Sequence, residues 1–261
     1  MSNGEVFKYK DILRESDLDP LKNKSCFLTE DIIAFYFRYL SSLCKTDDIM
    51  LLLPSESFSL ANYEDDNGVS TFAENEKLST KRLVVFPVND CYDFSEGDRG
   101  SHWSVLVYSR SMNAFLHFDS IAGTNNLPAE KLYEAVKKYI GVGGQVPSAA
   151  LMKKQKNKNK KASAVSQPVS KPCQVVANAA APDGLPVFKE AETPQQTNTI
   201  DCGIYVLAIV KAIIDCFGDG SDSNTTDVPS VVATDVHQSI ESTMRTEILE
   251  LVNNLRKNVI E

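Results

Sequence analysis

The sequence predicts an α+β fold in which helices pack on a small, mainly antiparallel sheet. Short apolar runs typical of strands lie in the middle of the chain, and an almost wholly apolar helical segment follows them. Amphipathic helical patterns lie near both ends. The length of 261 residues and the 43% hydrophobic content suit one domain, spanning residues 1–261, with a core of its own.

The first predicted element is a helix over Thr29 to Leu43, because apolar residues recur at helical spacing and acids at its start complement the helix dipole. A fully apolar run over Leu83 to Val88 follows and suits a central strand. Two further runs, Trp103 to Tyr108 and Ala114 to Phe118, are separated by five turn-forming residues. They predict a β-hairpin.

Three more helices are predicted toward the C-terminus. The segment Ala129 to Ile140 has a helical pattern, and Asp201 to Phe217 is apolar on nearly every side, as a buried helix requires. The last segment is an amphipathic surface helix, whose apolar residues recur at steps of three and four: Ile240, Met244, Ile248, Leu251, Leu255 and Val259.

Residues 141 to about 181 differ in composition from the rest of the chain. They are rich in Lys, Ser, Ala, Gly and Pro and poor in aromatics, which predicts a disordered insertion in a loop. Removing its seven lysines from the net charge of −8 leaves −15 for the remainder. Such an acidic body favours basic protein surfaces as partners, although a solvated body with a tolerated insertion explains the same charges. The lysine run is also a weak nuclear-import signal.

Composition excludes several classes of protein. The acidic net charge disfavours nucleic-acid binding, and the most apolar stretch, Gly203 to Ile214, is too short for a membrane span. Six cysteines without a C-x-x-C pair, three scattered histidines and an N-terminus without a signal-peptide pattern predict reduced thiols and no metal site. We therefore expect a protein of the cytosol or nucleus. We also expect it to be a monomer.

The predicted hairpin brings a histidine and an aspartate together. With its turn centred between Arg110 and Ser111, His102 lies directly opposite Asp119 on the same face, with Cβ atoms about 4.5–5.5 Å apart. At that distance a carboxylate can orient an imidazole. His117 shares this face and competes as a candidate, although a structural histidine is the simpler interpretation.

Cys202 opens the apolar helix, with Asp201 as a candidate N-cap and Gly203 allowing close approach of backbone or substrate. The first turn of a helix favours a thiolate, although a lone cysteine there is more commonly an inert core residue. Together with a paired His and Asp it forms a complete nucleophilic constellation. The polar loop before it, 194–200, offers an amide that could join the Cys202 N–H in stabilising an oxyanion.

These motifs resemble those of the Ulp/sentrin-specific cysteine protease family, which cleaves after the Gly-Gly end of ubiquitin-like modifiers. The matching segments read GSHWS at 100–104, HFDS at 117–120 and PQQTNTIDCG at 194–203. The resemblance implies a papain-like fold with Cys202 as nucleophile and His102 as general base and then acid. It further implies Asp119 as the residue that orients His102, and Gln196 as the oxyanion-hole side chain.

The resemblance also implies substrate contacts. Trp103 would cover the diglycine tail in a narrow tunnel, although an ordinary core aromatic is the alternative, and Gly203 and Glu30 would lie beside the substrate. The family pattern Trp-Leu-Asn-Asp is replaced here by Phe-Leu-Thr-Glu at 27–30, which keeps an acid at Glu30.

Within the family the chain looks most like the small deneddylase branch, the sentrin-specific protease 8 type. The resemblance implies processing of the Nedd8/Rub precursor and release of this modifier from target lysines, with no metal or organic cofactor. Two alternatives remain from the sequence: a protease for SUMO, and a catalytically inactive module that binds a ubiquitin-like modifier.

Overall fold

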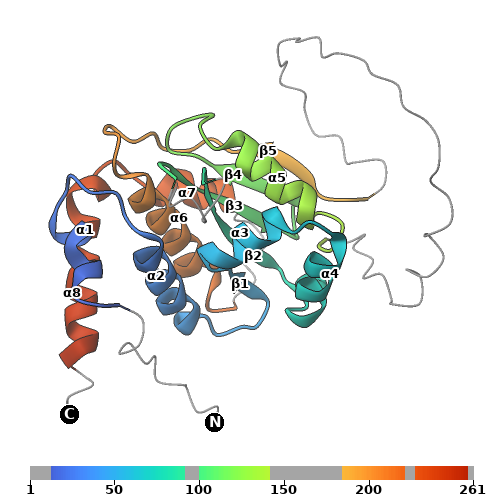
Figure 1. Ribbon diagram of the computed structural model, residues 1–261, viewed down its shortest axis with the longest axis horizontal. Coiled ribbons are helices and arrows are strands. Elements are labelled where there is room, and N and C mark those ends of the chain that lie inside the picture. Colours follow the sequence, from blue (N-terminus) through green and yellow to red (C-terminus); the bar gives the residue numbers. More distant parts are fainter. Residues whose placement is uncertain (1–12, 92–99, 142–183, 221–226, 258–261) are drawn as a thin grey trace.

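The structure, a computed structural model, describes residues 13–91, 100–141, 184–220 and 227–257. The predicted insertion lies outside these residues, apart from residue 141. The described chain forms a five-stranded sheet with helices on both faces (Figure 1). This arrangement is an α+β fold.

The strands lie in the sheet in their order along the chain: β1 (Ile49–Leu51), β2 (Leu83–Asn89), β3 (Trp103–Ser109), β4 (Ala114–Phe118) and β5 (Val187–Glu190). The two central pairings are antiparallel, whereas each edge strand pairs in parallel with its neighbour. The sheet is therefore mixed, and the prediction of a mainly antiparallel sheet describes its three central strands. The edge strands are only three and four residues long, which is too short for a clear sequence signal.

Two hydrophobic clusters lie on opposite faces of the sheet. One face is covered by α1 (Asp19–Lys22), α2 (Glu30–Leu43), α6 (Cys202–Phe217), α7 (Val228–Asp235) and α8 (Ile240–Lys257). The other is covered by α3 (Pro54–Asn62), α4 (Asp66–Asn75) and α5 (Asn126–Val136). Two single turns of 3-10 helix, Ser16–Leu18 and Leu78–Thr80, complete the described elements.

The predicted helices are present, with some shifts of their ends. α2 begins after Thr29, and α6 has the predicted length from Cys202 onward. α5 begins three residues earlier than predicted, at Asn126, and ends at Val136. α8 begins at Ile240 as predicted.

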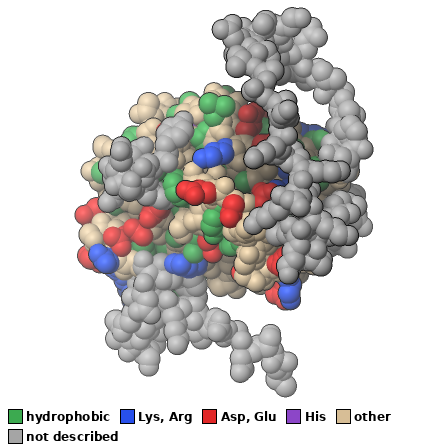
Figure 2. Space-filling view, turned by 45° about the vertical axis from the view of Figure 1, so that its right-hand side comes forward, with side chains coloured by type: hydrophobic (Ala, Val, Ile, Leu, Met, Phe, Trp, Pro, Cys, Tyr) green, Lys and Arg blue, Asp and Glu red, His purple; other side chains and the backbone are tan. Residues whose placement is uncertain are grey.

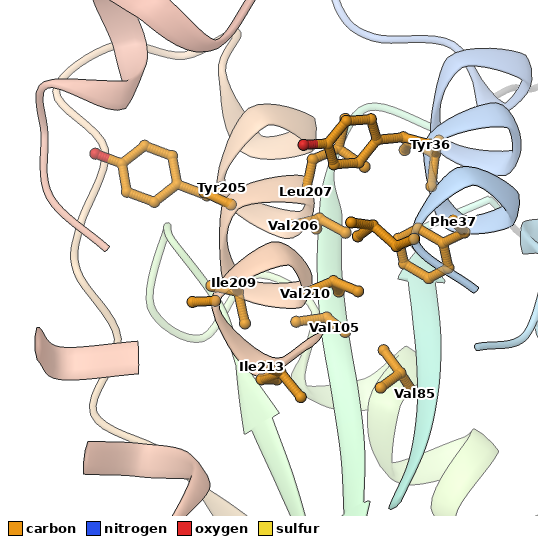
Figure 3. Close-up of a cluster of buried hydrophobic side chains, with 14 of the residues drawn as sticks. Tyr36, Phe37, Val85, Val105, Tyr205, Val206, Leu207, Ile209, Val210 and Ile213 are labelled. Carbon is orange, nitrogen blue, oxygen red and sulfur yellow. The ribbon is translucent and has the colours of Figure 1, made fainter. Parts of the chain in front are cut away.

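α6 is the central helix of the molecule, with 13 of its 16 residues buried. Its side chains Val206, Leu207 and Val210 pack toward α2 and toward the strands (Figure 3). Tyr205 points to the opposite side of the helix (Figure 3). Because α6 contacts apolar surface on several sides, its first residue, Cys202, has a fixed position relative to the sheet.

The β3–β4 hairpin has a different register from the predicted one. Leu106 pairs with His117, and the turn centres between Ser111 and Met112 rather than between Arg110 and Ser111. Pairing is shifted by two residues, so His102 is not directly opposite Asp119. Side chains alternate with a period of two, however, and a shift of two keeps both residues on the same face.

The packing of α6 predicts that truncating one of its buried side chains causes a large loss of stability. Leu207→Ala removes a fully buried side chain and should lower the free energy of unfolding by about 2–5 kcal/mol. Leu43→Ala, also in a helix but with Leu43 47% exposed, should have a much smaller effect in the same urea titration. Equal effects of the two variants would contradict this description of the core.

Candidate active site

A histidine and an aspartate meet at the open end of the β3–β4 hairpin. His102 directly precedes β3 and Asp119 directly follows β4. The His102 Nε2 atom lies 2.6 Å from Asp119 Oδ1, and both side chains are almost fully buried. A buried hydrogen bond of this length between an imidazole and a carboxylate fixes the plane of the ring.

The Asp119 carboxylate has further donors on both oxygens. The backbone N–H of Ile121 donates to Oδ1 over 3.0 Å, and that of Asn125 donates to Oδ2 over 3.0 Å. Burial raises the pKa of Asp119, but the hydrogen bonds from His102 and from the two backbone groups outweigh it, so that the pKa is lowered. Asp119 is therefore ionised at neutral pH.

Cys202, the first residue of α6, completes a group of three and is fully buried. Its side chain lies close enough to His102 to raise the pKa of that imidazole. Since Nε2 of the ring is bound to Asp119, Nδ1 is the nitrogen that remains for the thiol. The structure thus brings together the three residues that the sequence motifs suggested: cysteine, imidazole and carboxylate.

The charges of this group favour a protonated ring. Burial lowers the pKa of His102, but the hydrogen bonds with Asp119 and Cys202 outweigh it and raise the pKa from 6.5 to about 9. At neutral pH the imidazole therefore carries its proton beside the thiol. An imidazolium next to a cysteine at a helix N-terminus stabilises the nucleophilic thiolate.

The backbone of His102 is held by residues that sequence reasoning missed. Asp90 Oδ1 accepts from the backbone N–H of Ser101 over 2.6 Å and from that of His102 over 2.9 Å. Asn125 Nδ2 donates to the His102 carbonyl over 3.3 Å. Asp90 and Asn125 are 12 and 23 residues from His102, and no periodic pattern links them to it. Only the fold could identify them.

The loop that carries Gln196 is fastened to the segment after Asp119. Ser120 Oγ donates to Gln196 Oε1 over 2.7 Å, and Gln196 Nε2 donates to the Asn198 carbonyl over 2.6 Å. Oε1 is thus occupied, and Nε2 keeps a second N–H for another acceptor. Gln195, which the sequence did not single out, donates from Nε2 to the Asp119 carbonyl over 2.9 Å.

Asp201 has a different role from the predicted one. It occupies the N-cap position of α6 but makes no side-chain cap hydrogen bond. Its carboxylate instead accepts from Arg245 Nη2 over 2.6 Å and from Asn198 Nδ2 over 2.8 Å. The buried guanidinium competes for the carboxylate more strongly than a backbone N–H.

The candidate substrate contacts lie around this group. A Cβ on Gly203 would meet Leu28 Cβ at 2.9 Å, so the protein itself fills the space that the sequence left for backbone or substrate. This contact places the start of α2, with the exposed Glu30 as its first residue, beside Cys202. Trp103 is 8% exposed and forms part of the wall of an apolar pocket between α3 and α5.

His117 is excluded as a partner of Cys202 by its own contacts. The ring is fully buried, with Nδ1 2.9 Å from Glu190 Oε1 and Nε2 2.9 Å from Ser104 Oγ. Both nitrogens are therefore occupied, as expected for a structural histidine.

Within the described residues, no group of three or more His, Cys, Asp or Glu side chains is arranged to hold a metal ion. The same part of the chain contains no helix with the length and apolar character needed to cross a membrane. The five described cysteines form no disulfide bonds.

Comparison with protein families gives a match over residues 27–231 to the Ulp1 protease family, C-terminal catalytic domain. NEDD8-specific protease 1 of Arabidopsis thaliana is 30% identical over 97% of this chain and 94% of its own length. Sentrin-specific protease 8 of Homo sapiens is 27% identical over 81% of this chain and 82% of its own.

Solved structures agree on the fold. A de-sumoylating protease superposes with a TM-score of 0.60 at 17% identity, over 95% of this chain and 88% of its own. The yeast Ulp1 protease domain in complex with Smt3, the yeast ortholog of SUMO, superposes with a TM-score of 0.50 at 15% identity, over 94% of this chain and 90% of its own. At these identities the likeness concerns the fold alone.

The raised pKa of His102 predicts how stability depends on pH. The unfolded chain loses the His102 proton near pH 6.5, whereas the folded protein keeps it up to about pH 9. The stabilisation is thus fully present below pH 6.5 and lost as pH rises through 9. The free energy of unfolding of the wild type, minus that of His102→Gln, should fall across this window in urea titrations. A difference independent of pH would contradict the ion pair.

Proposed function

This chain belongs to the Ulp1 protease family, and we propose that it is a deneddylase, a cysteine peptidase that cleaves after the C-terminal Gly-Gly of the modifier Nedd8/Rub. It processes the modifier precursor and releases the modifier from the lysines of its targets. The observation that carries the chemistry is the buried group of Cys202, His102 and Asp119, with the protonated imidazole beside the thiol.

The mechanism uses this group in two steps. The Cys202 thiolate attacks the carbonyl carbon of the terminal glycine, and the proton on His102 passes to the departing amine as the C–N bond breaks. A thioester between enzyme and modifier results. His102 then takes a proton from water, and the hydroxide attacks the thioester carbon. The C–S bond breaks, which releases the modifier with a free carboxylate and returns Cys202 to its thiol. Asp119 keeps the ring oriented and balances its charge throughout.

Gln196 and the backbone N–H of Cys202 supply the oxyanion hole. The Gln196 amide is oriented by Ser120, which binds its oxygen, so that its second N–H is available for the tetrahedral oxyanion. Trp103 and Glu30 contact the tail of the modifier, and Gly203 lies beside it as the residue that lets Leu28 pack against α6.

The assignment of the modifier is supported by the relatives. The NEDD8-specific protease aligns over nearly the whole of both chains, whereas the similarity to de-sumoylating enzymes is one of fold. A ubiquitin-like modifier and its conjugates are therefore the proposed partners. We further propose that the enzyme acts as a monomer in the cytosol or nucleus, where cysteines without disulfides, such as those described here, persist.

An adduct experiment tests the modifier and the nucleophile together. The protein is incubated with Nedd8, SUMO and ubiquitin that each carry a C-terminal electrophile, with Cys202→Ala as control. The expected result is an adduct with Nedd8 alone that the control lacks. Labelling by SUMO would support the mechanism but contradict the assignment of Nedd8 as the modifier. Labelling by none of the three would favour the inactive binding module.

The acidic charge of the protein predicts that salt slows its association with the modifier. Acidic side chains occur in several groups on the face in Figure 2, in keeping with the net charge of −8. If they attract a basic face of the modifier, kcat/KM should fall as NaCl rises from 50 to 500 mM, on the order of several-fold, with kcat unchanged. A constant kcat/KM would exclude electrostatic steering.

A further inference from the structure

Two charged side chains of α8, one helical turn apart, contact the loop between Gln196 and Cys202. They are Glu241 and Arg245. The loop itself, residues 191–201, contains no helix or strand. Its conformation therefore depends on side-chain hydrogen bonds together with a backbone bond from the Gln196 N–H to the Ser120 carbonyl over 3.0 Å. Each of the two side chains lies 44 residues beyond the loop residue that it binds, and α8 touches none of the three residues Cys202, His102 and Asp119 through a described hydrogen bond.

Glu241 binds the residue that follows Gln196. One carboxylate oxygen accepts from the backbone N–H of Thr197 over 2.7 Å, and the other accepts from the Thr197 hydroxyl. The Tyr205 hydroxyl, from the first turns of α6, donates to Glu241 over 2.9 Å. Burial raises the pKa of Glu241, but the hydrogen bonds from Thr197 and Tyr205 lower it by more, so the group is ionised. One carboxylate thus joins the loop to α6.

Arg245 fixes α8 in place for this contact. It is 2% exposed, and its Nε and Nη2 atoms both donate to Asp201 Oδ1, over 3.0 and 2.6 Å. Nη1 donates to the carbonyl of Pro20 in α1. A buried guanidinium with these partners cannot shift without leaving charges unpaired. The start of α8 is therefore held against the N-terminus of the nucleophile helix.

We infer that Glu241 is a positioning residue of the active site, one that acts through Thr197 on the amide of Gln196. The inference rests on the proposed function, because Gln196 matters only if an oxyanion forms. Donors stabilise an oxyanion when they lie about 2.7–3.1 Å from it, and a small displacement loses much of the effect. Without Glu241, Thr197 loses two hydrogen bonds and the adjacent Gln196 amide gains freedom.

Kinetics separate positioning from simple stabilisation of α8. For hydrolysis of Nedd8 carrying a C-terminal fluorogenic amide, Glu241→Ala should lower kcat about 10-fold or more, with KM changed less than about two-fold. The alkylation rate of Cys202 by iodoacetamide should change less than about two-fold, because this reaction needs the thiolate and His102 but no oxyanion hole. Glu241→Gln, which keeps an acceptor for Thr197, should recover most of kcat.

The matched control is Glu250→Ala, which removes the same charge from an exposed position of the same helix and should leave kcat unchanged. An unchanged kcat in Glu241→Ala would overturn the inference. So would a parallel fall in kcat and in alkylation, because that pattern reports damage to the thiol or to folding.

A double-mutant cycle tests the route through Gln196. On a Gln196→Ala background, Glu241→Ala should have less than about a two-fold further effect on kcat, because the group that it positions is gone. Fully additive losses would show that Glu241 does not act through Gln196. Failure of the proposed function looks different: the wild type would then hydrolyse no modifier, while alkylation of Cys202 would proceed normally.

Discussion

The hydrogen bond between His102 and Asp119 is the interaction on which the site depends. Neither residue is inside a strand, so the sheet brings them together without fixing their side chains. Groups from elsewhere complete the arrangement. The N–H of Asn125 at the start of α5 donates to the Asp119 carboxylate, whereas Asp90, directly after β2, and Gln195, in the loop before α6, hold the backbones of His102 and Asp119. The buried pair is stable because both carboxylate oxygens and His102 Nε2 have hydrogen-bond partners.

The two sides of the site are built differently. On the sheet side, the backbone N–H of Ile121 orients the Asp119 carboxylate, and the Asn125 amide donates to the His102 carbonyl. On the helix side, apolar packing fixes α6 and hence Cys202, and the preceding loop takes its shape from charged side chains of α8. A cysteine peptidase needs both sides. The thiolate must lie beside the imidazolium, and the oxyanion-hole donor must lie within hydrogen-bond distance of the oxyanion.

Much of this could be predicted from the sequence. The central strands, α2, α6 and the start of α8 followed from hydrophobic periodicity, and the motifs singled out Cys202, His102 and Asp119 as candidates. The register of the hairpin was wrong, yet the pairing of His102 with Asp119 survived because the error was an even number of residues.

The rest depends on contacts that no local pattern encodes. The edge strands are too short to give a period. Arg245 occupies a buried position on a face of α8 where an apolar residue is usual, and its partner Asp201 has the appearance of an ordinary helix cap in the sequence. Gly203 looked like a site of substrate approach, whereas its partner, Leu28, comes from a segment more than 170 residues earlier. Such pairs are defined only when the chain has folded.

The central claim is that His102 carries a proton beside Cys202 at neutral pH. The chain has only three histidines, so nitrogen-15 labelling of histidine gives a spectrum in which His102 can be assigned by its loss in His102→Gln. We predict that both ring nitrogens of His102 are protonated at pH 7.5, with a midpoint of about 9. A neutral ring at pH 7.5 that becomes protonated only below about pH 6.5 would contradict the account.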